Sequence, residues 1–466
     1  MHIQDLFKTV VNGGYCIGCG ACASLSDSPI EIRFDEDKKL QPYIKQDDTE
    51  DNMTVSALLV CPFSGKSKNE DEIGEELYSK IGNKNDKLGY AAATYAGFVK
   101  EASFRENGSS GGMGSWIMAE LFREGYIDSV IHIHSNTPDE NNPKLFQYTI
   151  SSTLEDIYAG AKSRYYPIEL SAVIKEVKER PGRYAFVGLP CFVKSVRLLM
   201  MQDPILKERI LFCMGLVCGH LKSAHFASMW AWQVGIFPDN LISIDFRTKL
   251  KDYGANQYGI TAKGLVEGKA ITRVSPPLKE LFGADWGWGL FKYKACDYCD
   301  DVVAETADVT IGDAWLPQYV KDAEGTNVII IRDERINNIL NKAKSQNRIH
   351  LDKLTPDQVI SSQSSGFAHR REGLSYRLSL LEKASQWYPP KRVQPSDKAV
   401  DNKTKRKLDL RIILSEKSHE YFKEALAKKS FDLLKTKLMP FINEYYQLYK
   451  TSYVKKIFTR LKKRFL

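Results

Sequence analysis

The chain has 466 residues, of which 43% are hydrophobic and 27% are charged, and its formal net charge is +8. This length exceeds what one ordinary hydrophobic core accommodates, so two or three domains are expected. The sequence contains no long uninterrupted apolar run and starts without a basic segment followed by an apolar one. These features argue against a membrane-spanning helix and a signal peptide, and we expect a cytoplasmic protein.

The positive charge is concentrated at one end of the chain. Residues 391–466 hold 21 Lys and Arg against 8 Asp and Glu, which leaves the first 390 residues slightly acidic. The charge therefore gives no reason to expect nucleic acid binding by the rest of the protein. Nine cysteines, several of them in metal-type spacings, indicate a reducing compartment and metal ligation, because a disulfide framework would use an even number.

Residues 13–32, "GGYCIGCGACASLSDSPIEI", contain the first cysteine motif. Cys16, Cys19 and Cys22 have the C-x2-C-x2-C spacing of thiolates that bind a [4Fe–4S] cluster. Gly18 and Gly20 lie between them, where glycine allows the backbone to curl close to the cluster. Three thiolates leave such a cluster one ligand short.

The fourth ligand is expected at a distance in the sequence. In bacterial ferredoxins the run continues with a Cys-Pro that ligates a second cluster, but this position holds Ser26. The later Cys-Pro in this region is Cys61-Pro62, and the positions counted back from it hold no cysteine. We therefore predict a ferredoxin-like module over residues 1–65 with one cluster bound by Cys16, Cys19, Cys22 and Cys61. The alternatives are a zinc knuckle, or three free thiols with a buried Cys61.

Residues 66–90 are charged and contain several glycines, so we expect a linker with a short helix. From residue 91 onward strands and helices alternate. A strand is expected within 92–100, a glycine loop, helix and strand within 110–135, and a helix, Pro-Gly turn and strand within 172–191. The pattern predicts an α/β core over residues 91–390, in which ligands bind beyond the carboxyl ends of the strands.

The remaining cysteines suggest a second metal site. Cys296 and Cys299 form a C-x2-C pair, Cys191 follows a predicted strand, and Cys213 and Cys218 lie in or after another. The Cys296–Cys299 pair together with two of the single cysteines could supply four thiolates. The alternative is that the single cysteines are ordinary buried core residues.

Six motifs in order resemble a known family: "RENGSSGG", "FVGLPCFVKSVRLL", "GLVCGHLKS", "FRTK", "CDYCDD" and "ADVTIGDAW". They are similar to the family of coenzyme F420 hydrogenase/dehydrogenase beta subunits, which includes plant hydroxymethyl chlorophyll a reductases and bacterial relatives in surface-polysaccharide clusters. The resemblance implies two [4Fe–4S] clusters and an FAD, with the second cluster at Cys191, Cys218, Cys296 and Cys299. Cys218 is preferred to Cys213 because Cys213 lies inside a predicted strand.

The resemblance also implies flavin-binding positions. The glycine loop can offer N–H groups and hydroxyls to a phosphate ahead of a helix, and "KSRYYP" supplies two cations near the flavin. The positions are Gly108, Ser109, Ser110, Gly111, Gly112, Lys162, Arg164 and Asp313. Each of these positions also has an explanation without a flavin. The glycine loop could only begin a helix, Lys162 and Arg164 could lie in water at the start of a helix, and Asp313 could be an ordinary turn residue.

Residues 391–466 are expected to form a basic helical tail. Val454, Ile457, Phe458, Leu461 and Phe465 have helical spacing and are surrounded by Lys and Arg. Such a segment can lie on anionic lipid at the inner membrane face, or pack on the core with its charged face in water.

The expected fold is thus α+β and α/β: a ferredoxin-like module, a mixed α/β flavin-binding core and a helical tail. The expected function is oxidoreductase chemistry in which clusters exchange electrons with FAD, supplied by a ferredoxin or a partner redox subunit. The alternative is a non-catalytic electron-transfer or scaffold subunit. The substrate, the direction of electron flow and the use of F420 are not determined by the sequence.

Overall fold

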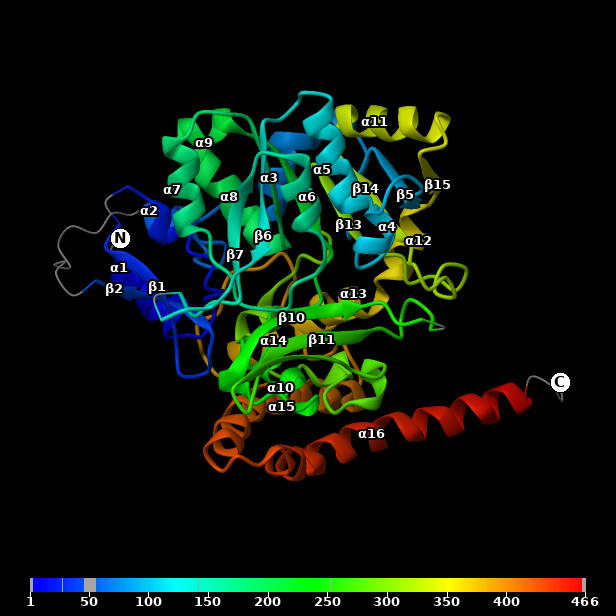
Figure 1. Ribbon diagram of the computed structural model, residues 1–466. Helices are drawn as coiled ribbons and strands as arrows, with labels where there is room; N and C mark the ends of the chain where they lie inside the picture. The colour runs from blue at the N-terminus through cyan, green and yellow to red at the C-terminus, as the bar shows by residue number, and fades with distance from the viewer. Residues whose placement is uncertain (1–2, 27, 46–55, 141, 252, 463–466) are drawn as a thin grey trace.

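A computed structural model describes residues 3–26, 28–45, 56–140, 142–251 and 253–462, and within these ranges the side chains of residues 4 to 449. The protein is a mixed α/β structure with an eight-stranded mixed sheet and a helical C-terminal region (Figure 1). In Figure 1 the large sheet and its helices form the upper part of the molecule, and a three-stranded sheet with the last two helices of the chain forms the lower part.

The large sheet has four parallel strands at its centre and antiparallel strands on both sides. In spatial order the strands are β15 (Ile349–Lys353), β5 (Ala93–Val99), β14 (Asn327–Ile331), β13 (Val309–Asp313), β9 (Ile210–Leu216), β8 (Tyr184–Gly188), β6 (Ser129–Ser135) and β7 (Phe146–Ser151). The parallel set is β13-β9-β8-β6, so the carboxyl ends of these strands meet at one edge.

Helices cover both faces of this sheet. The first face packs against α5 (Met113–Arg123), α6 (Leu154–Ala159) and α11 (Glu334–Ser345). The second packs against α7 (Ser171–Glu179), α8 (Pro190–Gln202) and α9 (Pro204–Arg209). The strands, helices and glycine loop that the sequence predicts within 92–135 and 172–191 are confirmed.

The N-terminal region contains α1 (Ile3–Leu6), the hairpin of β1 (Ile30–Phe34) and β2 (Leu40–Ile44), and α2 (Ser56–Val60). Its apolar side chains belong to the same hydrophobic cluster as those of α7 and α8. The N-terminal region is therefore packed directly on the α/β core.

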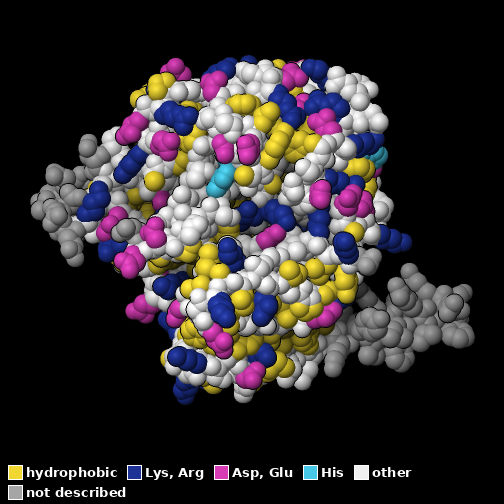
Figure 2. Space-filling view, viewed as in Figure 1, with side chains coloured by type: hydrophobic (Ala, Val, Ile, Leu, Met, Phe, Trp, Pro, Cys, Tyr) yellow, Lys and Arg dark blue, Asp and Glu magenta, His cyan; other side chains and the backbone are white. Residues whose placement is uncertain are grey.

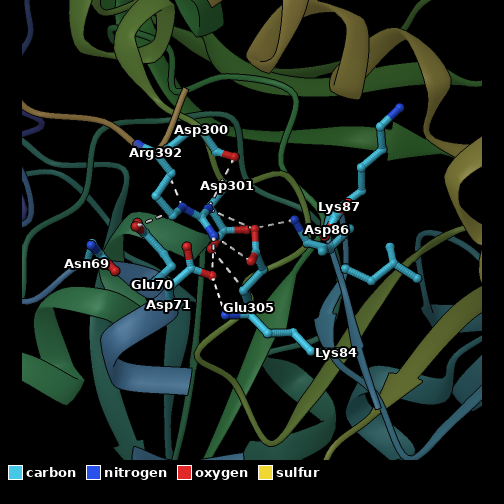
Figure 3. A network of polar contacts seen from close by, with 12 residues as sticks. Asn69, Glu70, Asp71, Lys84, Asp86, Lys87, Asp300, Asp301, Glu305 and Arg392 are labelled. Carbon is cyan, nitrogen blue, oxygen red and sulfur yellow. Dashed lines mark hydrogen bonds and ion pairs between the residues drawn. The ribbon is translucent and has the colours of Figure 1, made fainter. Parts of the chain in front are cut away.

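Residues 66–90, expected as a linker, are packed against the core. They form α3 (Glu70–Tyr78), which begins with a capping box between Asn69 and Glu72, and the short strands β3 (Lys84–Asn85) and β4 (Gly89–Tyr90). Figure 3 shows Arg392 among carboxylates from this segment and from the loop that follows Cys299. Its Nη1 lies 2.7 Å from Glu305 Oε2, and its Nε lies 3.3 Å from Asp300 Oδ2 and 3.7 Å from Glu70 Oε2. Three distant stretches of chain are thus held by one buried guanidinium.

The lower part contains α10 (His225–Gln233) and the antiparallel sheet of β10 (Leu241–Thr248), β11 (Gly259–Val266) and β12 (Lys269–Val274). The C-terminal helices are α12 (Pro356–Ser362), α13 (Ser364–Arg370), α14 (Glu372–Lys383), α15 (Asn402–Ala427) and α16 (Phe431–Lys462), and a further short helix is α4 (Phe104–Asn107). Leu410, Leu414 and Phe422 of α15 and Leu434 and Leu438 of α16 are fully buried in the main core. Residues 402–445 are therefore part of the packed protein.

None of the helices in the described part of the chain has the length and apolar composition that crossing a bilayer requires. The side chains of Val454, Ile457, Phe458, Leu461 and Phe465, on which the membrane-surface prediction depends, lie outside the described residues. That interpretation stays a prediction.

Candidate functional site

The first cysteine group forms where the N-terminal loop meets α2 and α7. Burial raises the pKa of the Cys16 and Cys22 thiols, and the neighbouring thiols, Cys61 among them, raise it further. Burial also raises the pKa of Cys61 to about 12, with a contribution from Cys19. The four thiols predicted as one ligand set are thus neighbours in space.

The two glycines of this loop adopt backbone conformations that other residues rarely adopt. Gly18 and Gly20 have φ angles of 65° and 77°, in the left-handed region. A Cβ on Gly18 would lie 2.3 Å from the Leu40 carbonyl oxygen, and one on Gly20 would lie 2.7 Å from Glu169 Oε2. Only glycine lets the loop approach its neighbours this closely.

The second cysteine group draws on three separate elements. Cys191 lies in the first turn of α8, Cys218 lies just beyond β9, and Cys296 and Cys299 lie in and after a short 3-10 turn over Lys294–Tyr298. Burial raises the pKa of Cys191, and the other three thiols raise it further. The Cys218 N–H donates to the Val302 carbonyl at 3.1 Å, which fixes the strand end against the cysteine loop.

Cys213 does not belong to this group. It lies inside β9, and because neighbouring residues of a strand point to opposite faces, its side chain faces the α7 and α8 side of the sheet. Burial raises its pKa to about 12, and its charged neighbours are Arg197 and Asp308. The sequence-based interpretation of Cys213 as a strand interior residue is confirmed.

The two groups are adjacent to each other and to a cavity. Cys19 is close enough to Cys191 to raise the pKa of its thiol, and both thiols raise the pKa of the buried Tyr148 phenol. Cys218 lines a cavity of about 950 Å³ at the carboxyl ends of the parallel strands. Figure 2 shows Lys and Arg side chains gathered across the middle of one face, between the upper and lower parts of the molecule.

The predicted glycine loop lies at this cavity, ahead of α5. Gly108, Ser109, Ser110 and Gly112 line it, whereas Gly111 packs against Asn327 and Gly97 outside the lining. Gly112 has a φ of 79°, and a Cβ there would lie 2.6 Å from the Phe104 carbonyl. The loop therefore holds a tight turn that only glycine allows, with its two hydroxyl-bearing residues at the cavity.

The predicted Lys162, Arg164 and Asp313 also line the cavity. Lys162 Nζ lies 2.6 Å from Asp245 Oδ2, so its charge is already paired. Burial lowers the pKa of Arg164, and its buried Nε has no hydrogen-bond partner in the described protein. Such a donor fits an anionic group in the cavity.

Arg247 of the "FRTK" motif is a site residue that the sequence did not predict. It is 4% exposed, donates to Asp313 and to the Ser109 carbonyl at 3.1 Å each, and has an unpartnered Nε among the described residues. Burial opposes its charge, but Asp313 holds its pKa above the ordinary value. Asp313 thus orients the Arg247 guanidinium and stabilises its charge. The sequence feature that could have identified Arg247 as a site residue is its position in the "FRTK" motif.

Other lining residues come from the C-terminal helices. They are His369 and Arg370 of α13, Arg411 of α15, and Tyr445 and Tyr449 of α16. No local sequence pattern distinguishes Arg411 or the two tyrosines from ordinary helix residues. Only their packing brings them to the cavity.

Each cysteine group offers four thiols, which is the donor set of a [4Fe–4S] cluster. Four thiolates can also hold a zinc ion, with sulfurs about 2.3 Å from the metal. In the described residues, no group of three or more His, Cys, Asp or Glu side chains is arranged to hold one metal ion.

Two family models match the chain. The model of the N-terminal part of the coenzyme F420 hydrogenase/dehydrogenase beta subunit matches residues 94–175, and that of its C-terminal part matches residues 182–357. Together they cover more than half of the chain.

Two curated proteins match the chain at low sequence identity. The chain is 26% identical over 236 residues to a subunit of the F(420)H(2) dehydrogenase of Methanosarcina mazei, covering 50% of this chain and 59% of that protein. It is 24% identical over 349 residues to the coenzyme F420-dependent sulfite reductase of Methanocaldococcus jannaschii, covering 74% and 48%. The chain thus spans about half the length of the curated relatives it matches.

A solved structure, the xenon-derivatised F420-reducing [NiFe] hydrogenase complex of Methanosarcina barkeri, contains a chain that matches with a TM-score of 0.47 and 16% identity, covering 68% of this chain and 100% of that one. On the two family models, this chain belongs to the family of coenzyme F420 hydrogenase/dehydrogenase beta subunits.

Proposed function

We propose that this chain is an iron–sulfur flavoprotein that exchanges electrons between two [4Fe–4S] clusters and FAD, as an oxidoreductase or as the flavin-bearing component of one. The proposal is carried by the spatial order of the thiols. Cys19 of the first cysteine group neighbours Cys191 of the second, and Cys218 of the second group lines the cavity. Members of the family carry iron–sulfur clusters and flavin, which supports the same assignment.

The eight grouped thiols would be the cluster ligands. Cys16, Cys19, Cys22 and Cys61 would hold one cluster, and Cys191, Cys218, Cys296 and Cys299 the other. Two neighbouring groups donate hydrogen bonds to these sulfurs: the Gly18 N–H to Cys16 Sγ at 3.3 Å, and the Leu221 N–H to Cys296 Sγ at 3.2 Å. Such bonds stabilise negative charge on sulfur.

The cavity would hold the FAD. Its volume lies at the upper end of the range for cofactor sites, and its walls include aromatic residues such as Tyr165, Trp286 and Tyr258. When bound, a flavin couples one-electron exchange with clusters to two-electron chemistry on a substrate. Gly108, Ser109, Ser110 and Gly112, with Arg164 and Arg247, would bind the phosphates, because they offer N–H, hydroxyl and guanidinium donors.

Three of the predicted residues would act indirectly. Gly111 would keep the loop in its tight path, since a Cβ there would lie 2.7 Å from the Gly97 carbonyl. Lys162 would fix the loop beside it through Asp245, and Asp313 would hold the Arg247 guanidinium.

The partner of this reaction would be another redox protein. Both curated relatives are named for F420-linked oxidoreductases, and one of them is named as a subunit. The chain would therefore exchange electrons with a ferredoxin or a partner redox subunit, and F420 itself remains one candidate for the two-electron substrate. Peripheral contact of the basic C-terminal end with anionic lipid is retained as a prediction.

The test is anaerobic purification followed by measurement of iron, acid-labile sulfide and flavin per chain. The proposal expects about eight irons and about one flavin. Arg247→Gln should lose flavin and keep its iron, whereas Arg183→Gln, which changes an exposed pair with Asp128, should keep both. Iron without flavin in the unaltered protein would favour the alternative of an electron carrier, and absence of iron would refute the cluster assignment.

A further inference from the structure

Arg370, the last residue of α13, is one of the largest side chains that the protein buries completely. It is 1% exposed and lines the cavity at the carboxyl ends of the parallel strands. Its Nη2 donates a hydrogen bond to the Gly219 carbonyl at 2.6 Å, and Gly219 directly follows Cys218 of the second cysteine group. The guanidinium is therefore held against the loop that carries this cysteine.

The guanidinium is also a neighbour of three thiols of the same group. Burial opposes its charge, but the thiols of Cys299, Cys218 and Cys296 hold the pKa of Arg370 above its ordinary value. Burial raises the pKa of Cys218 to about 12, and Arg370 acts against this rise. Burial likewise raises the pKa of Cys296 to about 11, against the effects of the Leu221 N–H and of Arg370. One cation thus serves several thiols of the second group.

Arg370 has no carboxylate partner among the described residues, whereas two neighbouring cations do. Arg371 Nη2 lies 3.3 Å from Glu305 Oε1, and Lys391 Nζ lies 3.6 Å from Asp300 Oδ1. The Nε of Arg370 is buried and finds no hydrogen-bond acceptor in the described part of the chain. An arginine in a protein does not lose its proton. Such a permanent buried charge is unfavourable unless an anion lies beside it.

The carboxylates of the cysteine loop have partners of their own. Asp297 Oδ1 lies 2.6 Å from Lys292 Nζ. Asp301, a neighbour of Cys218, accepts hydrogen bonds from two N–H groups of its own loop at 2.9 and 3.0 Å. The sulfurs of the second group are therefore the groups that can supply the anion beside Arg370.

A cluster in the second group would be that anion. Four thiolates give a [4Fe–4S] cluster a negative charge, and its reduction adds one further electron. A fixed positive charge nearby stabilises the reduced cluster more than the oxidised one, so it raises the reduction potential. The first group has a different environment, because Lys194, a neighbour of Cys61, is already paired with Glu70 at 3.1 Å.

We propose that Arg370 is the counterion of the second [4Fe–4S] cluster and raises its reduction potential, which favours residence of the electron at the cluster beside the cavity. The proposal rests on the proposed function, because it names the residue that tunes one of its two clusters. The electron comes from the redox partner of that function, and Arg370 keeps its protons throughout. Arg370 lies beyond residue 357, where the family match ends.

The test is a redox titration of the full-length protein, purified anaerobically and followed by electron paramagnetic resonance. Cys61→Ala, which would keep the second cluster alone, identifies the signal of that cluster. At a given potential, Arg370→Gln should lower the ratio of reduced to oxidised second cluster about ten- to a hundredfold. Each factor of ten is a shift of about 59 mV to lower potential. The first cluster should titrate as in the unaltered protein.

The matched control is Arg371→Gln, which removes a positive charge at the next position of the chain. Its partner Glu305 keeps a second partner, Arg392, at 2.7 Å, so both potentials should stay as they are in the unaltered protein. Arg370→Lys keeps the charge and should restore most of the potential that Arg370→Gln loses. A purely structural role of the arginine would not produce this rescue.

If Arg370→Gln does not retain the second cluster, Arg370→Lys decides in its place. Retention by the lysine variant would show that the cluster needs the positive charge, whereas loss from both variants would overturn the proposal. An unchanged potential in Arg370→Gln, or an equal shift in Arg371→Gln, would overturn it as well. An unaltered protein without two clusters would instead refute the proposed function, and its iron content reveals this before any titration.

Discussion

Cys19 and Cys191 lie within electrostatic range of each other, although they belong to different groups of four cysteines. Tyr148, fixed by a hydrogen bond from its hydroxyl to the Val187 carbonyl, lies beside both. The two groups are therefore neighbours through these two thiols, and the second group reaches the cavity at Cys218. In the proposed function, electrons would pass between the groups at this point.

The first prediction concerns the remote ligand of the first group. Cys61→Ala should lower the iron content by about four per chain, because Cys61 supplies the fourth thiolate that the N-terminal run lacks. Iron and sulfide analysis of the anaerobically purified variant measures this. Unchanged iron, together with alkylation of Cys61 in the native protein, would show that this cysteine is not a ligand.

The second prediction separates Cys218 from Cys213. Cys218→Ala should cost about four irons, whereas Cys213→Ala should keep all of its iron and lose about 1 kcal/mol of unfolding free energy from reduced packing. The reason is that Cys213 points to the α7 and α8 face of the sheet, near Arg197 and Asp308. Iron loss from Cys213→Ala alone would reverse the assignment.

The third prediction concerns Arg392, which lies among Glu305, Asp300 and Glu70 (Figure 3). Arg392→Met should lower the free energy of unfolding by about 3–5 kcal/mol, because buried carboxylates would lose their partner. Denaturant titration followed by circular dichroism measures the change.

The comparison for this prediction is Arg406→Met. Arg406 makes a two-point ion pair with Glu444, but both side chains are about 40% exposed. Its loss should change the free energy of unfolding by at most about 1 kcal/mol. Equal effects of the two variants would mean that the Arg392 contacts add nothing beyond an exposed pair.

The fourth prediction concerns pH and His132, which lines the cavity and lies 2.8 Å from the Ser151 hydroxyl through Nε2. Burial lowers its pKa from 6.5 to about 3, and His134 and Arg164 lower it while Asp156 raises it. The unfolded chain therefore binds a proton that the folded protein does not. As a result, stability falls as the pH decreases from about 6.5 towards 3, by up to about 1.4 kcal/mol per pH unit for this residue.

His132→Gln should make the free energy of unfolding depend less steeply on pH, because the contribution of one histidine is removed. The measurement is the free energy of unfolding of the variant and of the unaltered protein at pH 7.5, 6.5 and 5.5. Histidines far from this site contribute equally to both proteins and cancel in the difference. His134, whose Nε2 lies 3.0 Å from His132 Nε2, titrates together with it, so the difference reports the pair. Parallel curves for the two proteins would show that the pKa of His132 is the same in the folded and the unfolded protein.

Features that depend on local spacing could be predicted before the structure was known. The helical period of residues 113–123 and the alternation of 129–135 predicted the α5 and β6 elements, because burial of one side of a helix or strand imposes its period on the sequence. Local spacing also predicted the C-x2-C-x2-C run with Gly18 and Gly20. It likewise predicted the position of Cys213 inside a strand. The glycine loop before α5 was marked by its composition, because the turn at Gly112 excludes a Cβ.

Contacts between distant segments became known from the packing of the folded chain. Residues 66–90 have the composition of a linker, yet Glu70 pairs with Arg392, which also pairs with Asp300 and Glu305. Charged side chains can be buried when partners from elsewhere in the chain neutralise them. Arg411 and the tyrosines of α16 have ordinary helical surroundings in the sequence, and packing of the C-terminal helices places them in the cavity wall. Such contacts depend on residues hundreds of positions apart, so no local period or motif encodes them.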